Sequence, residues 1–123
     1  MNEPLESFCD RWLASWTGGD PDRLLAFYAH DAVYIDPAWP DGLRGHAALH
    51  GYLSRLLRLY PDWVWRREAL HPVPGGFILR WRARLHPDST HEARGMDLIE
   101  LEGGLIVRNE VYFDPRHLFG ALR

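Results

Sequence analysis

Asp97 falls where a sheet would turn a carboxyl group toward its apolar side. Within the run 91–102 it keeps step with Ile99 and Leu101, so we expect its side chain to point inward with theirs. An isolated buried carboxylate is costly, and burial raises the pKa of such a group until the neutral acid prevails. A neutral acid facing a cavity would donate a hydrogen bond to whatever lies there. The alternative is that Asp97 bonds tyrosine or tryptophan side chains, or that a bulge turns it to solvent.

Asp36 is the second carboxyl residue that could do chemistry. It ends the run Ala32–Asp36 and follows Tyr34 by two residues, which places both on one face of a strand. A strand could thus turn a second carboxyl group to the same side as a tyrosine ring. The competing interpretation is turn chemistry beside Pro37, where aspartate is common.

Other reactive side chains give weaker patterns. His46 and His50 are four residues apart, the spacing of a two-histidine metal face, but no third inward ligand accompanies them. We therefore expect surface histidines, no metal site and no cofactor. Cys9 lies in the apolar stripe of a helix, where an inert thiol is expected.

The elements that must position these residues are readable from hydrophobic spacing. A helical period predicts helices over about 5–16, 20–28 and 49–60, with a strand at 32–36 and a loop at 37–45. After Pro61 the period changes to two, which predicts a four-strand antiparallel meander over about 63–71, 77–85, 91–102 and 105–113. Gly103 and Gly104 form a strong hairpin signal between the last two strands. The predicted fold class is α+β, with three N-terminal helices covering one face of an antiparallel sheet.

The two faces of the predicted meander differ in chemistry. In the last strand the alternation directs Leu105, Val107 and Asn109 inward. The inward face of the meander is otherwise apolar and carries Phe77, Leu79, Trp81, Ile99, Leu101, Val111 and Phe113. The opposite face alternates arginine with glutamate, at Arg80, Arg82, Arg84, Glu100 and Glu102. Cross-strand pairs of opposite charge suit either a solvated outer face or a polar dimer interface.

Length and composition limit the function classes. The 123 residues fit a single domain spanning 1–123, and a net charge of −3 creates no field that would attract nucleic acid. No apolar run approaches the ~18 residues that a membrane span needs. A lone cysteine fits a reducing compartment, so we expect a cytoplasmic protein with neither nucleic acid nor membrane as partner.

Two segments resemble a known superfamily. Residues 16–20 (WTGGD) followed by 24–37 (LLAFYAHDAVYIDP) resemble the nuclear transport factor 2-like superfamily, closest to its SnoaL-like polyketide cyclase and ketosteroid isomerase branches. The ending at 112–115 (YFDP) also resembles SnoaL-like domains. The resemblance implies a cystatin-like cone, in which three helices and a curved sheet enclose a deep pocket, commonly in a homodimer. The superfamily holds isomerases, cyclases, hydrolases, dehydratases and non-catalytic modules, so the resemblance indicates fold better than function.

The resemblance also implies roles for single residues. Asp36 falls where ketosteroid isomerases keep the aspartate base, and Asp97 falls where they keep a neutral aspartic acid that donates to the substrate oxygen. Trp12 stands where the isomerases have a tyrosine donor. An indole N–H is a weaker, differently placed donor that cannot share a proton with an oxyanion, so classical steroid isomerisation is not expected.

Two functions follow as hypotheses. The first is a cofactor-independent isomerase or cyclase for a small hydrophobic carbonyl compound, with Asp36 as base, Asp97 as neutral acid and the Trp12 N–H as a further donor. The second is a non-catalytic ligand-binding or dimerisation module. In either case we expect the pocket wall to be formed by Trp12, Trp16, Tyr34, Tyr52, Trp65, Leu79, Trp81, Asn109, Val111 and Phe113.

Overall fold

A computed structural model describes residues 3–115, which form three helices and a six-stranded sheet. The helices are α1 (Leu5–Ala14), α2 (Pro21–Leu25) and α3 (His46–Leu59). The strands are β1 (Tyr28–Asp36), β2 (Trp39–Arg44), β3 (Val64–Val73), β4 (Gly76–Arg84), β5 (Ala93–Glu102) and β6 (Leu105–Phe113). No helix within this part of the chain is long and apolar enough to cross a membrane.

The sheet has the order β2-β1-β6-β5-β4-β3. Strands β3 to β6 form the predicted antiparallel meander. Strand β1 lies parallel to β6 and antiparallel to β2, so the expectation of a purely antiparallel sheet is corrected to a mixed one. The parallel pairing brings the end of the first strand beside the last strand, which is what brings Asp36 near the meander.

Two predicted boundaries in the first half of the chain are wrong. The expected loop at 37–45 contains β2. Pro40 and Gly42 suggested a turn, but an edge strand, which pairs on one side only, tolerates both residues. The second helix ends at Leu25 rather than near Tyr28, which instead begins β1. Its predicted start is confirmed, since the Asp20 side chain accepts hydrogen bonds from the backbone N–H groups of Asp22 and Arg23.

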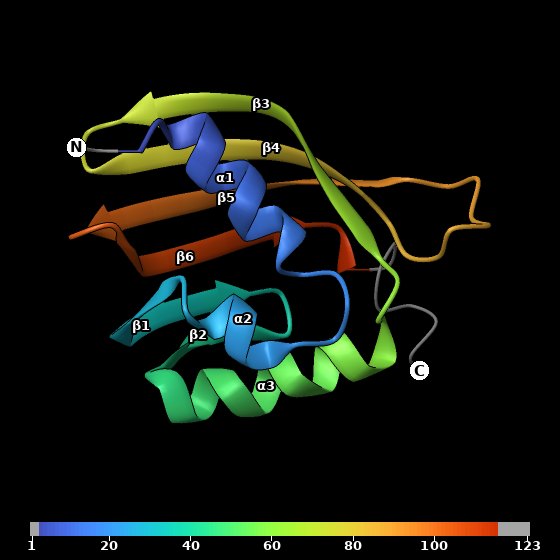
Figure 1. Cartoon of the computed structure of the whole chain (residues 1–123), viewed down its shortest axis with the longest axis horizontal. Helices are drawn as coiled ribbons and strands as arrows, with labels where there is room; N and C mark the ends of the chain where they lie inside the picture. The colour runs from blue at the N-terminus through green and yellow to red at the C-terminus, as the bar shows by residue number, and fades with distance from the viewer. Residues whose placement is uncertain (1–2, 116–123) are drawn as a thin grey trace.

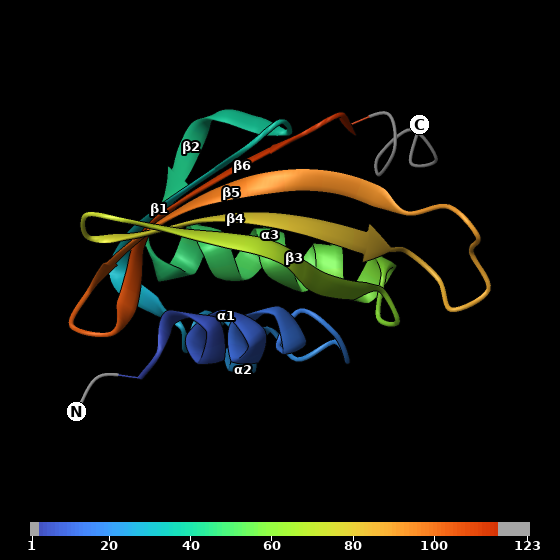
Figure 2. The same cartoon turned by 90° about the horizontal axis from the view of Figure 1, so that it is seen from above.

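The helices lie along one side of a curved sheet (Figures 1 and 2). Helix α1 contacts β3, and α3 contacts β1 and β2, so the two long helices cover opposite edges of the same face. Only α1 and α2 precede all strands, because α3 follows β2. The apolar stripes of α1 and α3 and the inner sheet face form one core, which includes Phe8, Cys9, Trp12, Leu13, Leu49, Leu53, Leu57, Phe77, Leu79 and Ile99.

The last hairpin shows where strict alternation fails. Gly103 and Gly104 have φ values of +58° and +81°, the conformation expected of a tight two-residue turn. The register between β5 and β6 shifts by one residue after Glu100, a bulge that opposes two residues to one. As a result Ile106 is fully buried while Leu105 is exposed, which corrects the prediction that Leu105 faces inward.

Candidate functional site

Asp97 lies in the regular part of β5, opposite Leu79 of β4 and Val111 of β6. Its residue surface is only 4% exposed. One carboxyl oxygen, Oδ1, accepts a hydrogen bond of 2.7 Å from the Trp81 indole Nε1. The other, Oδ2, accepts one of 2.8 Å from Asn109 Nδ2. The carboxyl group is therefore buried and held by two neutral N–H donors.

Burial controls the protonation of Asp97. Its pKa is raised to about 7 in total, mainly by loss of solvent. The hydrogen bonds from Asn109 and Trp81 lower this pKa, and the negative charge of Asp36 raises it. Each carboxyl oxygen has two lone pairs, and one on each is taken by an N–H group. The remaining positions can carry a proton. Near neutral pH the side chain is thus poised between an acid that donates and a carboxylate that accepts.

A buried chain of hydrogen bonds leads from α1 to Asp97. The Trp12 Nε1 donates to the Tyr28 hydroxyl at 3.2 Å, and that hydroxyl donates to Asn109 Oδ1 at 2.8 Å. Asn109 then donates to Asp97. The expected role of the Trp12 N–H as a pocket donor is corrected, because this group is already bonded to Tyr28.

Asp36 is held in a different way at the end of β1. It is 3% exposed, and its Oδ2 accepts from the hydroxyl groups of Tyr34 at 2.9 Å and Tyr52 at 2.5 Å. Its Oδ1 accepts from the backbone N–H groups of Ala38 at 2.8 Å and Trp39 at 3.1 Å. The turn bonds expected beside Pro37 are therefore present. Sequence alternation placed Tyr34 on the face of Asp36 but carried no signal for its bond.

The two tyrosines beside Asp36 are donors that keep their protons. Burial raises the pKa of Tyr34 well above its usual value, and the negative charge of Asp36 raises it further. The pKa of Tyr52 is also raised, first by burial and then by Asp36. Both hydroxyl groups stay protonated across the physiological range and donate to the carboxylate.

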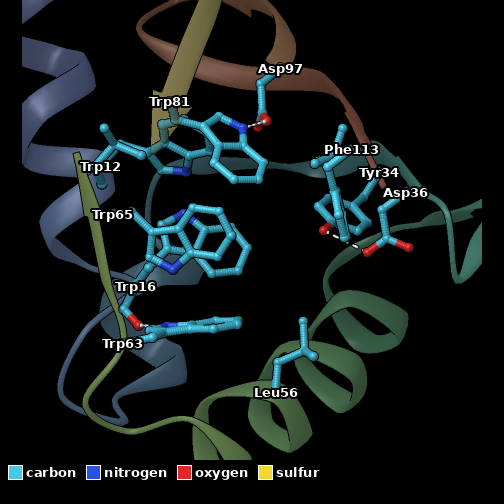
Figure 3. Close-up of a pocket in the computed structure, with 12 residues that line it drawn as sticks. Trp12, Trp16, Tyr34, Asp36, Leu56, Trp63, Trp65, Trp81, Asp97 and Phe113 are labelled. Carbon is cyan, nitrogen blue, oxygen red and sulfur yellow. Dashed lines mark hydrogen bonds between the residues drawn. The ribbon is translucent and has the colours of Figure 1, made fainter. Parts of the chain in front are cut away.

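Asp36 and Asp97 line the same cavity (Figure 3), which has a volume of about 30 Å³. In Figure 3 the tryptophans form one wall, Tyr34, Asp36 and Phe113 stand across from them, and Leu56 rises from α3 below. The full lining is Trp12, Leu13, Trp16, Tyr34, Asp36, Leu56, Trp63, Trp65, Trp81, Asp97, Val111 and Phe113. Except for the two carboxyl groups, the tyrosine hydroxyl and the indole N–H groups, this lining is apolar.

The tryptophan wall is a packed cluster. The ring centroids of Trp65 lie 4.5 Å from Trp81 and 4.9 Å from Trp63, both in edge-to-face geometry, and 6.0 Å from Trp16. The Trp63 Nε1 donates to the backbone oxygen of Trp16 at 2.5 Å, which ties the segment before β3 to the turn that follows α1. These contacts set the shape of the cavity.

The structure places seven of the ten predicted wall residues at the cavity. Trp12, Trp16, Tyr34, Trp65, Trp81, Val111 and Phe113 border the cavity. Three predicted wall residues do not border it. Leu79 is packed in the core, Tyr52 donates to Asp36, and Asn109 donates to Asp97. Leu13, Leu56 and Trp63 border the cavity without having been selected. Leu13 in α1, Leu56 in α3 and Trp63 just before β3 have a hydrophobic spacing that predicts burial in the core but not a place beside a cavity.

The histidines and the cysteine do not form a second site. His46 Nε2 lies 2.8 Å from the Tyr28 backbone oxygen, while His50 is 3.5 Å from Asp22, so the two rings serve different contacts. Among residues 3–115 no group of three His, Cys, Asp or Glu side chains is arranged to hold a metal ion. Cys9 is buried, and burial raises the pKa of its thiol to about 12, which leaves it an unreactive core residue.

Several solved structures share this architecture. A protein with a ketosteroid isomerase-like fold from Catenulispora acidiphila, in complex with trimethylamine, is 16% identical, with 95% of this chain and 92% of that chain covered and a TM-score of 0.78. TerC, co-crystallised with polyporic acid, is 13% identical, with 96% and 97% covered and a TM-score of 0.77. A putative isomerase of the SnoaL-like family from Agrobacterium tumefaciens is 19% identical, with 88% and 95% covered and a TM-score of 0.73. At these identities the similarity concerns the fold.

Sequence comparison narrows the assignment further. No curated protein matches the chain. The family described as the SnoaL-like domain matches residues 9–109, a segment that includes both aspartates and most of the cavity lining. The chain therefore belongs to the SnoaL-like domain family of the nuclear transport factor 2-like superfamily.

Proposed function

We propose that the protein catalyses proton transfer next to the carbonyl group of a small hydrophobic substrate, as an isomerase or a cyclase would. The observation that carries the proposal is that Asp36 and Asp97 line one apolar cavity while the pKa of Asp97 is raised to about 7. A carboxylate and a neutral acid on the same cavity are what enolate chemistry needs, because one accepts the proton and the other stabilises the oxygen.

The proposed step balances without a co-reactant. Asp36 takes a proton from the carbon beside the carbonyl, the electrons of that C–H bond form the enolate double bond, and the carbonyl electrons move to oxygen. Neutral Asp97 donates a hydrogen bond to that oxygen. Where the substrate has a C=C bond at the β,γ position, return of the proton from Asp36 to the γ carbon moves that double bond into conjugation with the carbonyl. Where it has a second carbonyl, attack of the enolate carbon on that group closes a ring, and the new alkoxide takes the proton from Asp36.

Asp36 must give up one of its present bonds to act as the base. It accepts from four donors, and the Tyr34 hydroxyl is the one among them whose residue lines the cavity. We expect the substrate to displace this hydroxyl from Oδ2. The two backbone donors and Tyr52 then keep the carboxylate in place.

The substrate class follows from the lining. Apolar walls with few polar groups suit a compact hydrophobic molecule with a carbonyl or hydroxyl group. A volume of about 30 Å³ is well below the roughly 150 Å³ of a cavity that holds benzene, so entry must move side chains of the wall. Trp65 and Phe113 are only partly buried and are best placed to move. Similar folds crystallised with polyporic acid and trimethylamine support a small-molecule ligand.

Solvent deuterium exchange tests the proposal without knowledge of the natural substrate. The purified protein is incubated with acetophenone in D₂O, and loss of the methyl proton signal is followed by NMR. The wild type should accelerate exchange, and Asp36→Asn should lower the rate at least about 100-fold, the range of general base catalysis. Asp41→Asn, an exposed aspartate of β2, is the matched control and should keep the wild-type rate. Wild-type exchange in both Asp36→Asn and Asp97→Asn would overturn the assignment.

A binding module is the second candidate, and one observation favours it. Every oxygen of both carboxyl groups is already bonded within the fold. In this candidate both carboxyl groups only accept these internal hydrogen bonds, and the cavity beside them holds a ligand without chemistry. A rise in melting temperature with acetophenone and no proton exchange in the wild type would favour this candidate.

Three sequence predictions belong to the same proposal. We expect a homodimer, a cytoplasmic location and chemistry without cofactor. The exposed Met96, Leu105 and Tyr112 belong to β5 and β6, and Met96 and Tyr112 are directly opposite each other in the sheet. Sedimentation equilibrium of the wild type would test the dimer, since a mass of one chain at micromolar concentration would contradict it.

A further inference from the structure

The indole N–H of Trp65 is a buried donor without a partner. Trp65 lies in β3, and its Nε1 is the one buried side-chain nitrogen or oxygen in the described part of the chain that makes no hydrogen bond. A buried donor left unpaired is costly, and folded proteins leave few of them. An exception of this kind calls for a ligand or a water.

Three other tryptophan N–H groups around the cavity do have partners. Trp12 donates to the Tyr28 hydroxyl, Trp63 to the Trp16 backbone oxygen and Trp81 to the Asp97 carboxyl group. The fold therefore uses each of these donors to hold itself together. Trp65, which occupies the same wall, is left out of that scheme.

The location of Trp65 ties this donor to the proposed site. Its ring lines the cavity and lies between Trp81 and Trp63, with the centroid of Trp81 4.5 Å away (Figure 3). Trp81 in turn holds Asp97. The unpaired donor is thus one side chain away from the acid that the proposed function uses.

We propose that the Trp65 N–H binds an acceptor oxygen of the ligand. This inference rests on the proposed function in one respect, that the cavity takes a small hydrophobic molecule. An indole N–H donates and never accepts, so the ligand must carry a carbonyl, ether or phenolate oxygen on an apolar ring. A ligand whose polar atoms are all donors, such as a protonated amine, leaves Trp65 unpaired. Trp65 thereby takes the donor role that the sequence assigned to Trp12.

A matched pair of probes tests the inference by NMR. Protein labelled with ¹⁵N is titrated with acetophenone and separately with ethylbenzene, which has a similar shape but no oxygen. The Trp65 indole proton should move downfield with acetophenone and stay nearly unchanged with ethylbenzene. The wild-type titration needs no variant to fold, and the Trp65 signal can be assigned from its contacts with Trp81.

Substitution provides the quantitative arm. Trp65→Phe keeps an aromatic ring without the donor, and it should weaken acetophenone binding about three- to tenfold relative to ethylbenzene, the loss of one neutral hydrogen bond. Tyr112→Phe is the matched control, because it removes an exposed hydroxyl donor that bonds Glu110 outside the cavity, and it should leave the ratio of the two affinities unchanged.

The outcomes separate the inference from the proposed function. If acetophenone binds and the Trp65 signal moves no more than with ethylbenzene, the donor is satisfied by water, and the inference is wrong while the proposed function stands. If neither compound binds, both are wrong. If the Trp65 response holds but Asp36→Asn exchanges protons at the wild-type rate, the inference stands and the catalytic proposal is wrong.

Discussion

The inner and outer faces of the sheet hold carboxyl groups in opposite ways. On the outer face Glu68 accepts from Arg82 at 3.0 Å and Arg94 at 3.1 Å, and Glu92 accepts from Arg66 at 2.9 Å. These hydrogen bonds lower the pKa of both glutamates. On the inner face Asp97 has only neutral donors in an apolar setting, and burial raises its pKa to about 7.

The difference teaches that the setting of a carboxyl group decides its chemistry. Alternate residues of one strand point to opposite faces of the sheet. A carboxyl residue moved by one position along β5 would therefore change from a buried acid to a solvated ion. The outer pairs are partly exposed and screened by water and salt. The inner group is shielded, and its protonation therefore governs both stability and the proposed chemistry.

The largest expected effect concerns pH. A raised folded-state pKa means that Asp97 contributes stability below its unfolded value near 3.8, and that this contribution is lost as pH rises through 7. Between pH 4 and 8 the wild type should lose about 4 kcal/mol in free energy of unfolding relative to Asp97→Asn, which cannot ionise. Urea unfolding at several pH values measures this difference.

In that experiment the informative quantity is the change of the free energy of unfolding with pH, not its absolute value. The amide introduced by Asp97→Asn retains one acceptor oxygen for two donors, so the absolute stability of this variant also changes. Outer glutamates affect both proteins equally and cancel in the comparison. Parallel pH profiles for wild type and Asp97→Asn would mean that Asp97 is not a buried acid.

The next largest effect tests the hydrogen-bond chain on the inner face. Tyr28→Phe removes the hydroxyl that accepts from Trp12 and donates to Asn109, leaving two buried groups unpaired. We expect a loss on the order of 3 kcal/mol, measured by urea unfolding. Tyr112→Phe on the exposed outer face is the control, since it removes only a hydroxyl that bonds Glu110. Equal losses in the two variants would remove the distinction between the faces.

A smaller effect should follow from crowding Trp81. A Cβ at Gly95 would lie 2.3 Å from the Trp81 ring carbon Cζ2, so Gly95→Ala must push the indole aside. We expect a loss of about 2 kcal/mol and a weaker bond from Trp81 to Asp97. Because that bond lowers the pKa of Asp97, its midpoint in an NMR titration should rise. A midpoint that stays at the wild-type value would argue that Trp81 does not hold the acid.

The smallest effect belongs to the outer face. Glu68→Gln removes a carboxylate that bonds Arg82 and Arg94 at the protein surface. The melting temperature should fall slightly at low salt and match the wild type at high salt. A loss that persists at high salt would show that the outer ion pairs are not screened by salt as solvated surface pairs are.

The sequence predicted the elements better than the contacts. Alternation was reliable for Asp97 because β5 pairs without interruption with β4 from Ala93 to Glu100 and with β6 from Gly95 to Glu100. It failed beyond Glu100, where a bulge exchanges the faces of Leu105 and Ile106. A bulge is set by the fit of two strands, so spacing along one strand does not reveal it.

The hydrogen bonds of the site lay beyond sequence reasoning for a similar reason. Tyr28 and Asn109 are 81 residues apart and meet because β1 lies parallel to β6, a pairing that no local pattern indicates. The Trp12 N–H was assigned to the pocket by resemblance, yet its direction depends on the packing of α1 against Tyr28. Side-chain packing in the folded molecule likewise decides that the indole N–H of Trp65 is unpaired, and spacing along the sequence does not reveal this.

The central claim is that Asp97 is a buried acid that is neutral up to near-physiological pH. Carboxyl ¹³C NMR on aspartate-labelled protein tests it directly, with the Asp97 signal assigned by its absence from Asp97→Asn. We predict a titration midpoint near 7. A midpoint near 4, the value of an ordinary solvated aspartate, would contradict it.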